Sequence, residues 1–181
     1  MKTEASALAG QLGAYARHLL AAHYLPRIER CLSIMSQKEI WWRPHSSSNS
    51  VGNLVLHLNG NVRQWIISGL GGGPDLRQRD KEFSERGPIP RRKLVAQLRA
   101  TVQEACGVIA KLTPRELERP RPIQGFCVSG LRALLHSTEH FALHTGQIIL
   151  VTKMKRRRDL GFTRLPGQKP KRSHAKSLPA L

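Results

Sequence analysis

Apolar residues recur every three to four positions along most of the chain, a pattern that predicts amphipathic helices. The first such stretch runs from Thr3, a suitable helix cap, to about residue 35. Its apolar positions are Leu8, Leu12, Tyr15, Leu19, Ala22, Ile28, Leu32 and Met35. Pro26 interrupts the stretch and removes one backbone donor, so we expect a kink or break near residues 22–26.

A second helix is predicted from Ser50, which precedes an apolar series at helical spacing. That series comprises Val51, Leu54, Val55, Leu58, Val62, Trp65 and Ile66. The glycine-rich segment 69–75 ends the helix. Although glycines also build phosphate-binding loops, no strand precedes this segment and no Gly-Lys-Ser/Thr follows it, which argues against a nucleotide site.

Two further helices complete the pattern. Pro90 suits the first turn of one helix, and Ser129 caps another that runs to about Lys155. Residues 76–89 are polar and are predicted to form a loop, and the stretch from Thr113 to Phe126 is a short turn followed by a proline-rich connection. Four substantial helices without a convincing strand predict an all-α fold, a four-helix bundle over residues 1–160.

The formal net charge of +18 is unevenly distributed over the 181 residues. From Lys155 onward, nine Lys or Arg residues accompany a single acid, Asp159. A basic excess attracts polyanions without naming one, and no helix-turn-helix or zinc-finger spacing supports a nucleic-acid partner. Residues 161–181 are basic, rich in Pro and Ser and poor in apolar periodicity, so we expect a flexible tail.

The sequence indicates neither membrane insertion nor export. No apolar run approaches the roughly 18 residues of a membrane-spanning helix, and the first 20 residues lack an apolar signal core. We therefore expect a cytoplasmic protein without a membrane partner. Cys31, Cys106 and Cys127 are widely spaced, which favours reduced thiols over a disulfide framework.

Three histidines in the fourth predicted helix are the main candidates for chemistry. His136, His140 and His144 lie at spacing four, so they share one helical stripe. Two imidazoles at that spacing can bind one ion, and His57, beside the apolar stripe of the second helix, can supply a third ligand. Spacing alone leaves open the alternative of hydrogen-bonded core histidines.

Several neighbours of these histidines are candidates for the surrounding site. Asn61, Gln147 and Trp42 are expected to line a pocket, with interhelical hydrogen bonding or core packing as the alternative. His136 and Glu139 are expected to support the site from outside the ligand set. No further acidic residue accompanies the three histidines in the sequence, so acid–base chemistry without a metal is not expected.

Four stretches resemble the DinB-like (DinB/YfiT-like) superfamily of metal-binding helical bundles, in particular a branch of unassigned function. They are "YLPRIERCLSIMSQKEIWWRP", "NSVGNLVLHLNGNVRQWI", "EHFALHTGQIILVTK" and "RDLGF". The resemblance covers about residues 10–162. It implies a four-helix bundle, often a homodimer, whose metal ligands are one histidine of the second helix and two of the last, here His57, His140 and His144.

The resemblance also implies an activity. Characterised relatives use the metal to activate a thiol or water, and several transfer low-molecular-weight thiols such as bacillithiol or mycothiol to electrophiles. We therefore expect a metal-dependent thiol S-transferase or hydrolase-like enzyme, with Zn²⁺, Ni²⁺, Fe²⁺ or Mn²⁺ as the ion. The alternative is a non-enzymatic, stress-associated protein with a structural metal and a polyanion-binding basic tail.

Overall fold

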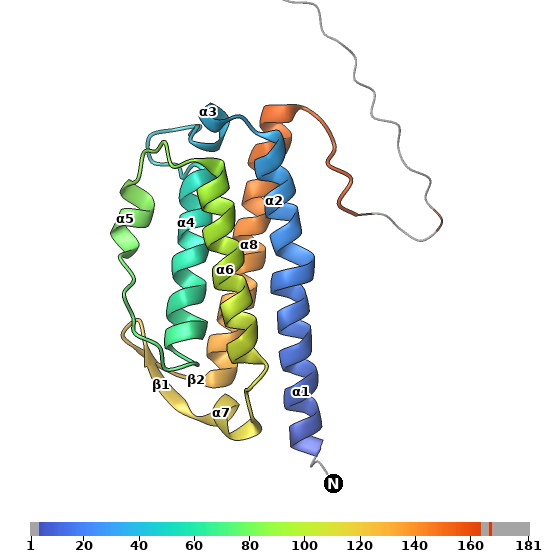
Figure 1. The fold of residues 1–181 in the computed structure, drawn as a ribbon, viewed down its shortest axis with the longest axis vertical. Coiled ribbons are helices and arrows are strands. Elements are labelled where there is room, and N and C mark those ends of the chain that lie inside the picture. Colours follow the sequence, from blue (N-terminus) through green and yellow to red (C-terminus); the bar gives the residue numbers. More distant parts are fainter. Residues whose placement is uncertain (1–3, 164–166, 168–181) are drawn as a thin grey trace, which may run out of the picture.

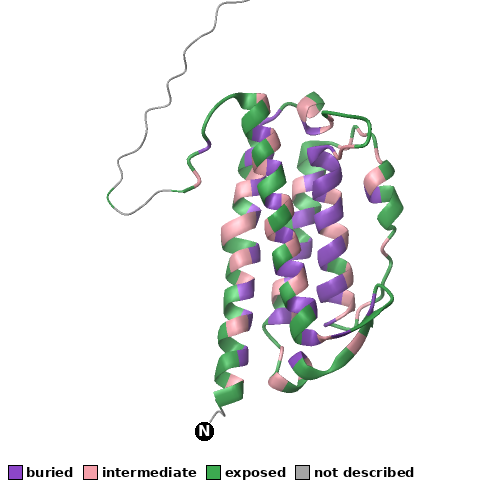
Figure 2. Cartoon of the chain, turned by 180° about the vertical axis from the view of Figure 1, so that it is seen from behind, coloured by how far each residue is buried: buried purple, intermediate pink, exposed green. Residues whose placement is uncertain are grey.

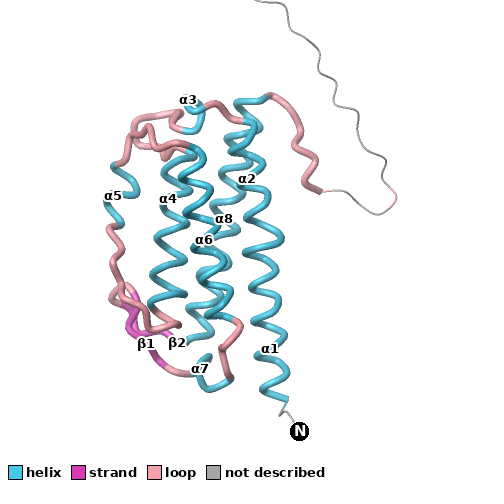
Figure 3. The backbone as a smooth tube through the Cα atoms, viewed as in Figure 1, coloured by secondary structure: helices cyan, strands magenta, loops and turns pink. Residues whose placement is uncertain are grey.

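Long helices lying side by side form most of the computed structural model, which describes residues 4–163 and residue 167 (Figure 1, Figure 3). The long helical segments are α1 (Glu4–Arg17), η1 (His18–Tyr24), α2 (Leu25–Ile34), α4 (Val51–Val62), η2 (Arg63–Ser68), α6 (Arg91–Ile109) and α8 (Gly130–Arg156). Helix α4 packs against both α6 and α8, and α2 packs against the same two helices from the other side. Mostly helical structure was predicted from the sequence.

The core lies between these helices. The largest completely buried side chains come from every long segment except α1, which buries only small residues. Buried positions face inward, and exposed positions cover the outer faces (Figure 2). The largest buried side chains include Leu20, Ile28, Leu58, Leu98, Leu134 and Phe141. The apolar stripe predicted from Val51 to Ile66 is buried as expected, as is the end of the first predicted stripe. The beginning of that first stripe was wrong: Leu8 and Tyr15 are 68 % and 61 % exposed, and Ala9, Ala16 and Leu20 are buried instead.

Pro26 does not break the first helix, but the helical hydrogen-bond pattern changes over residues 18–24, next to the segment where a kink or break was expected. The chain stays helical from Glu4 to Ile34, and Pro26 falls in the first turn of α2, where its missing N–H is least costly. The preceding segment η1 is π-helical, and the N–H of Leu25 donates to the carbonyl of Leu20, five residues earlier. A wider π turn shifts the hydrogen-bond ladder by one residue and so accommodates the proline.

The connection between α4 and α6 contains a helix that was predicted as loop. Helix α5 (Arg79–Ser84) is a short element with mostly polar residues, which explains why no apolar periodicity announced it. It packs against α4. Two other short helices, α3 (Gln37–Ile40) and α7 (Pro114–Glu118), lie at opposite ends of the bundle (Figure 1).

A two-stranded hairpin corrects the expectation that the chain has no strand. Strands β1 (Pro120–Ile123) and β2 (Phe126–Ser129) pair antiparallel, with Pro120 opposite Ser129. Gln124 and Gly125 both have positive φ, 55° and 81°, as a tight two-residue hairpin turn requires. The prolines obscured the strand in the sequence, but a two-stranded ribbon has free edges where they are tolerated.

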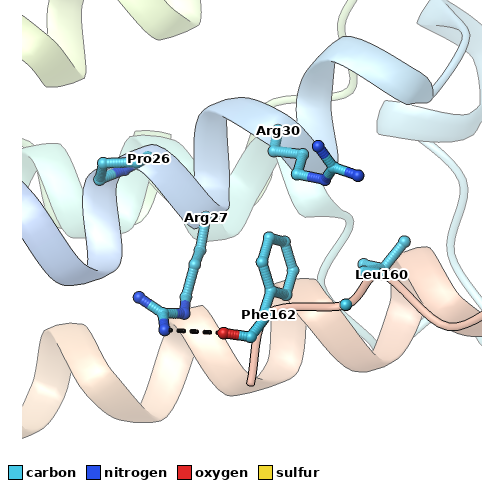
Figure 4. Close-up of a pocket in the computed structure, with 6 residues that line it drawn as sticks. Pro26, Arg27, Arg30, Leu160 and Phe162 are labelled. Atoms are coloured by element: carbon cyan, nitrogen blue, oxygen red, sulfur yellow. Dashed lines mark hydrogen bonds between the residues drawn. The ribbon is translucent and has the colours of Figure 1, made fainter. Parts of the chain in front are cut away.

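The chain after α8 folds back onto α2. Leu160 is buried, and Nη2 of Arg27 donates to the carbonyl oxygen of Phe162 at 3.2 Å (Figure 4). Arg27 also lies over the Phe162 ring, and a cavity of about 360 Å³ opens beside Arg30. Most of the predicted tail, residues 161–181, lies outside the described residues.

Two further features of the described residues concern the helices and the cysteines. None of the helices there combines the length and the apolar character needed to cross a bilayer. Cys31, Cys106 and Cys127 are all free thiols, and only Cys31 is buried.

Candidate metal centre

Two helices bring His57, His140 and His144 together, as the spacing argument predicted. His57 comes from the middle of α4, and the other two occupy successive turns of α8, which packs against α4. One nitrogen of each ring lies within 4.8 Å of the others. His57 is only 4 % exposed, whereas His140 and His144 are half-buried, so the cluster opens toward one side of the bundle.

The distances between the ring nitrogens fit a shared ion. Nε2 of His140 lies 2.8 Å from Nε2 of His57 and 3.1 Å from Nε2 of His144. With metal–nitrogen bonds of about 2.1 Å, ligands at right angles are about 3.0 Å apart and tetrahedral ligands about 3.4 Å apart. The two distances that involve His140 are therefore close to those between neighbouring ligands of one divalent ion.

The outer nitrogens of two rings determine which tautomer each ring adopts. Nδ1 of His57 donates to the Glu82 carboxylate at 2.8 Å, and Nδ1 of His144 donates to Oε1 of Gln147 at 2.6 Å. A neutral imidazole has one N–H, so Nε2 of both rings carries a lone pair directed at His140.

This arrangement leaves the cluster short of protons. A single proton on Nε2 of His140 satisfies one neighbouring lone pair and not the other, and an unsatisfied buried acceptor costs about 1–3 kcal/mol. Burial, followed by the charges of His144 and His57, lowers the pKa of His140 to about 3, so a second proton is not taken up near neutral pH. A cation among the three Nε2 atoms satisfies all of them, and the residues present thus fit a metal ion.

A buried ion pair holds His57 from behind. Glu82 of α5 is 8 % exposed and accepts hydrogen bonds from Nε and Nη2 of Arg77 at 2.8 and 2.9 Å. Gln64 extends the network by accepting from Nη1 of Arg77 at 2.9 Å. A carboxylate bound to the outer nitrogen of a metal-binding histidine orients the ring and increases its basicity.

The electrostatics keep Glu82 ionised. Burial alone raises the pKa of Glu82, but the hydrogen bonds from Arg77 and His57 outweigh it and hold the pKa below its ordinary value. Gly60, one turn after His57, makes room for this carboxylate, because a Cβ atom there would lie 1.9 Å from Oε1 of Glu82. The His57 ring therefore faces a charged acceptor at neutral pH.

Glu82 corrects the expectation that no further acidic residue accompanies the histidines. It lies 25 residues after His57 in a segment predicted as a polar loop, together with Arg77. Three acids occur between residues 79 and 85, and nothing in the sequence distinguishes the buried one. The contact arises only because α5 folds back onto α4.

Asn61 and His136 lie next to the cluster, as expected for supporting residues. The Asn61 side chain is buried, with its Nδ2 atom 3.5 Å from Nε2 of His136 and its Oδ1 atom without a hydrogen-bond partner among the described residues. The His136 ring packs between the rings of Trp65 and His140, at centroid distances of 3.9 and 5.4 Å. His136 does not belong to the metal-binding group.

The remaining candidates lie in different surroundings. Gln147 is exposed and contacts the cluster through His144. Burial lowers the pKa of His136. Glu139 is exposed, and its negative charge opposes this effect by raising the same pKa to a smaller extent. Nζ of Lys155 lies over the Trp42 ring, 4.2 Å from the ring centroid. Lys155 follows His144 by about 16 Å along α8, so Trp42 lies near the end of that helix and away from the cluster.

The pKa of His140 predicts how the metal-free protein responds to acid. The unfolded chain binds a proton on this ring below the ordinary value of 6.5, whereas the folded chain does so only near pH 3. Folding stability should therefore be complete above pH 6.5 and decrease as the pH falls from 6.5 toward 3. Urea unfolding of chelator-treated protein at several pH values measures this, and a His140→Gln variant should show a shallower decrease. Equal slopes in both proteins would contradict the assignment.

Comparison with known structures identifies the fold. The chain resembles a DinB-like protein from Bacillus subtilis with 17 % identity and a TM-score of 0.60, over 82 % of this chain and 94 % of that one. It resembles a DinB-like protein from Bacillus cereus ATCC 10987 with 13 % identity and a TM-score of 0.58, over 75 % and 87 % of the two chains. At these identities, the comparisons establish a DinB-like fold.

The family follows from the sequence. Residues 14–168 match the protein family of unknown function DUF1572, and since this is most of the chain, the protein belongs to that family. No curated protein matches the sequence. The resemblance to a DinB-like branch of unassigned function is thereby confirmed.

Proposed function

We propose that this protein is a metal-dependent enzyme that binds a divalent ion through His57, His140 and His144 and acts on a thiol or water, as a thiol S-transferase or a hydrolase-like enzyme. The ion is Zn²⁺, Ni²⁺, Fe²⁺ or Mn²⁺, because imidazole suits all four. A low-molecular-weight thiol is the proposed co-substrate. A bound divalent ion lowers the pKa of a coordinated thiol or water into the physiological range.

The number and arrangement of the ligands carry the proposal. In the described part of the chain, three histidines converge and no fourth protein group joins them. Closed structural sites of zinc have four protein ligands, whereas catalytic sites keep a position for water or substrate. The outer hydrogen bonds to Glu82 and Gln147 hold two of the rings in place without occupying such a position.

The surroundings supply groups that suit a small polar ligand. The buried Oδ1 atom of Asn61 has no partner and can accept a hydrogen bond from a bound thiol or water. Trp65 packs beside His136, and Phe83 packs on His57 at a centroid distance of 4.6 Å. Apolar walls with a few fixed polar groups are typical of small-molecule sites.

The proposal is tested by reconstituting the chelator-treated protein with each of the four ions and measuring thiol consumption. Bacillithiol, mycothiol and glutathione are each paired with an alkylating or haloaromatic electrophile, and an ester serves as the hydrolase substrate. We expect turnover that requires one of the ions and is abolished by chelator. A protein that binds an ion but leaves every rate at the uncatalysed level would contradict the enzymatic proposal.

The alternative function is a stress-associated protein with a structural metal and a polyanion-binding tail. Its support is the net charge of +18, much of it in residues after Lys155. The alternative requires a closed metal site, so the three-ligand cluster favours the enzyme. Salt-sensitive binding of a polyanion, retained after metal removal and without turnover, would favour the alternative instead.

The remaining expectations stay predictions. We interpret the four long helical units as the four-helix bundle of DinB-like proteins, with residues 1–160 as the folded domain and residues 161–181 as its basic, flexible tail. We also retain the cytoplasmic location, the absence of a membrane partner and the homodimer that the resemblance implies. A nucleic-acid partner has no motif to support it.

A further inference from the structure

Helix α5 brings a row of side chains from the metal centre to the surface. Phe83, the residue after Glu82, packs its ring on the His57 ring at a centroid distance of 4.6 Å. Arg79, one turn earlier on α5, places its guanidinium carbon 4.9 Å from the centroid of the Phe83 ring. His57 is buried, Phe83 is half-buried and Arg79 is exposed. The contacts therefore lead stepwise from a metal-binding histidine to a cation at the rim of the centre.

The Arg79 guanidinium is held in place but has no anionic partner. Its contact with Phe83 is a cation–π interaction, which steadies a planar charged group against an aromatic ring. Within the described part of the chain, this guanidinium takes part in no hydrogen bond or ion pair. The buried side chain of Arg77, by contrast, donates to Glu82 and Gln64. Arg79 thus keeps the five N–H donors of its planar fork for a ligand.

The charges around the three histidines favour a ligand that is negatively charged. Imidazoles bind a metal ion as neutral ligands, so a divalent ion there keeps its full positive charge. Among the residues that the structure describes, Glu82 is the only acid that is hydrogen-bonded to one of these rings, and Arg77 balances its charge. Arg79 adds a further positive charge at the rim. An anionic group on the ligand would be attracted to this rim.

The distances limit the size of a ligand that contacts both the centre and Arg79. The two contacts of Phe83 place the Arg79 guanidinium carbon within about 10 Å of the centre of the His57 ring. One residue of extended chain spans about 3.3–3.6 Å. A ligand of roughly two to three residue lengths can therefore reach from the histidines to Arg79 along the Phe83 ring.

We propose that Arg79 binds a carboxylate of the substrate and so selects molecules that carry this group roughly two to three residue lengths from the reacting atom. Phe83 positions the guanidinium and supplies an apolar surface between the two ends of the ligand. Paired charge-assisted hydrogen bonds from the planar guanidinium to the carboxylate fix the direction of the ligand. This role of Arg79 rests on the proposed function, because it needs a substrate bound at the three-histidine centre.

Binding of ω-mercaptocarboxylates to the full chain loaded with Co²⁺ tests the proposal, with the sulfur-to-cobalt absorption band as the readout. Each acid is compared with its neutral carboxamide over a series of chain lengths. Acids with about six to nine atoms between the sulfur and the carboxylate should bind about tenfold more tightly than their amides, because they reach Arg79. The shortest acids should show no such preference. Arg79→Ala should abolish the preference and leave the affinity for the amides unchanged.

Further variants locate the effect. Arg99→Ala removes the same charge from the surface of α6, where Arg99 pairs with Glu29, and should keep the preference. Arg132 of α8 is the competing cation, since its charge also acts on His136, and Arg132→Ala should keep the preference as well. Arg79→Lys should retain part of it, because an ammonium group keeps the charge without the planar fork. Circular dichroism confirms that each variant is folded.

The results separate the role of Arg79 from the proposed function. A preference for acids that survives Arg79→Ala, or that is lost in Arg132→Ala instead, would overturn the assignment. Acids and amides that bind equally well at every length would overturn it too, while leaving thiol binding at the centre intact. If no thiol binds to the loaded protein, the role of Arg79 fails together with the proposed thiol chemistry. The measurement needs no turnover, so it stays decisive for a protein without enzymatic activity.

Discussion

Replacing His57, His140 or His144 with alanine should remove the bound divalent ion. Three imidazoles share one ion, so the loss of any of them leaves two ligands and an affinity lower by at least about a hundredfold. The native protein, purified without a histidine tag and reconstituted, should contain about one ion per chain, and each variant close to none. Elemental analysis after dialysis measures the content, and titration with a chromophoric chelator measures the affinity.

Two other histidines provide matched controls for this experiment. His136→Ala removes an imidazole from the same stripe of α8 that is not in the metal-binding group, and His45→Ala removes an exposed one that bonds to Ser47. Both variants should retain the ion, the first with a reduced affinity at most. Full metal content in all three ligand variants, or no metal in the native protein after reconstitution, would refute the centre.

Replacing Glu82 with alanine should destabilise the protein by about 3–5 kcal/mol. The substitution leaves the Arg77 guanidinium, whose side chain is 3 % exposed, without its partner in a buried site. It also leaves Nδ1 of His57 without its acceptor, so metal affinity should fall about 10- to 100-fold. Urea unfolding of the metal-free protein measures the first effect, and metal titration measures the second.

An exposed salt bridge provides a reference for the size of that destabilisation. Arg63 and Glu104 are joined at 3.1 Å but are each about half exposed, so Glu104→Ala should cost at most about 1 kcal/mol. If Glu82→Ala is too unstable to study, Glu82→Gln keeps the shape and an acceptor for His57 and should show a smaller loss of both quantities. Unchanged stability and affinity in Glu82→Ala would mean that the ion pair supports neither the fold nor the centre.

The parts of the structure that the sequence predicted depend on local spacing. The long helices follow from apolar residues three and four apart, and the alignment of His140 with His144 follows from one helical turn. His57 was recognisable because it lies beside an apolar stripe that must face other helices. In each case the relevant neighbours are close in sequence, so the pattern is visible without knowing the tertiary structure.

The parts that were missed depend on contacts between distant segments. Glu82 becomes a partner of His57 only when α5 docks on α4, and no feature of its own neighbourhood predicts burial. The strand beginning at Pro120 was obscured by prolines, whose cost depends on whether a strand has a free edge. Pro26 was expected to kink or break the helix because it removes a backbone donor. The π-helical segment before it, which keeps the chain helical, has no signature in the sequence.

The docking of α5 has a consequence for how fast the centre exchanges its ion. The carboxylate that steadies His57 belongs to a surface connection, which can open locally at a much lower free energy than the bundle can unfold. Each opening would release the His57 ring from its charged acceptor while the helices stay assembled. The residence time of the ion should therefore follow the local opening of residues 75–85, and a protein of high global stability would still exchange its metal readily.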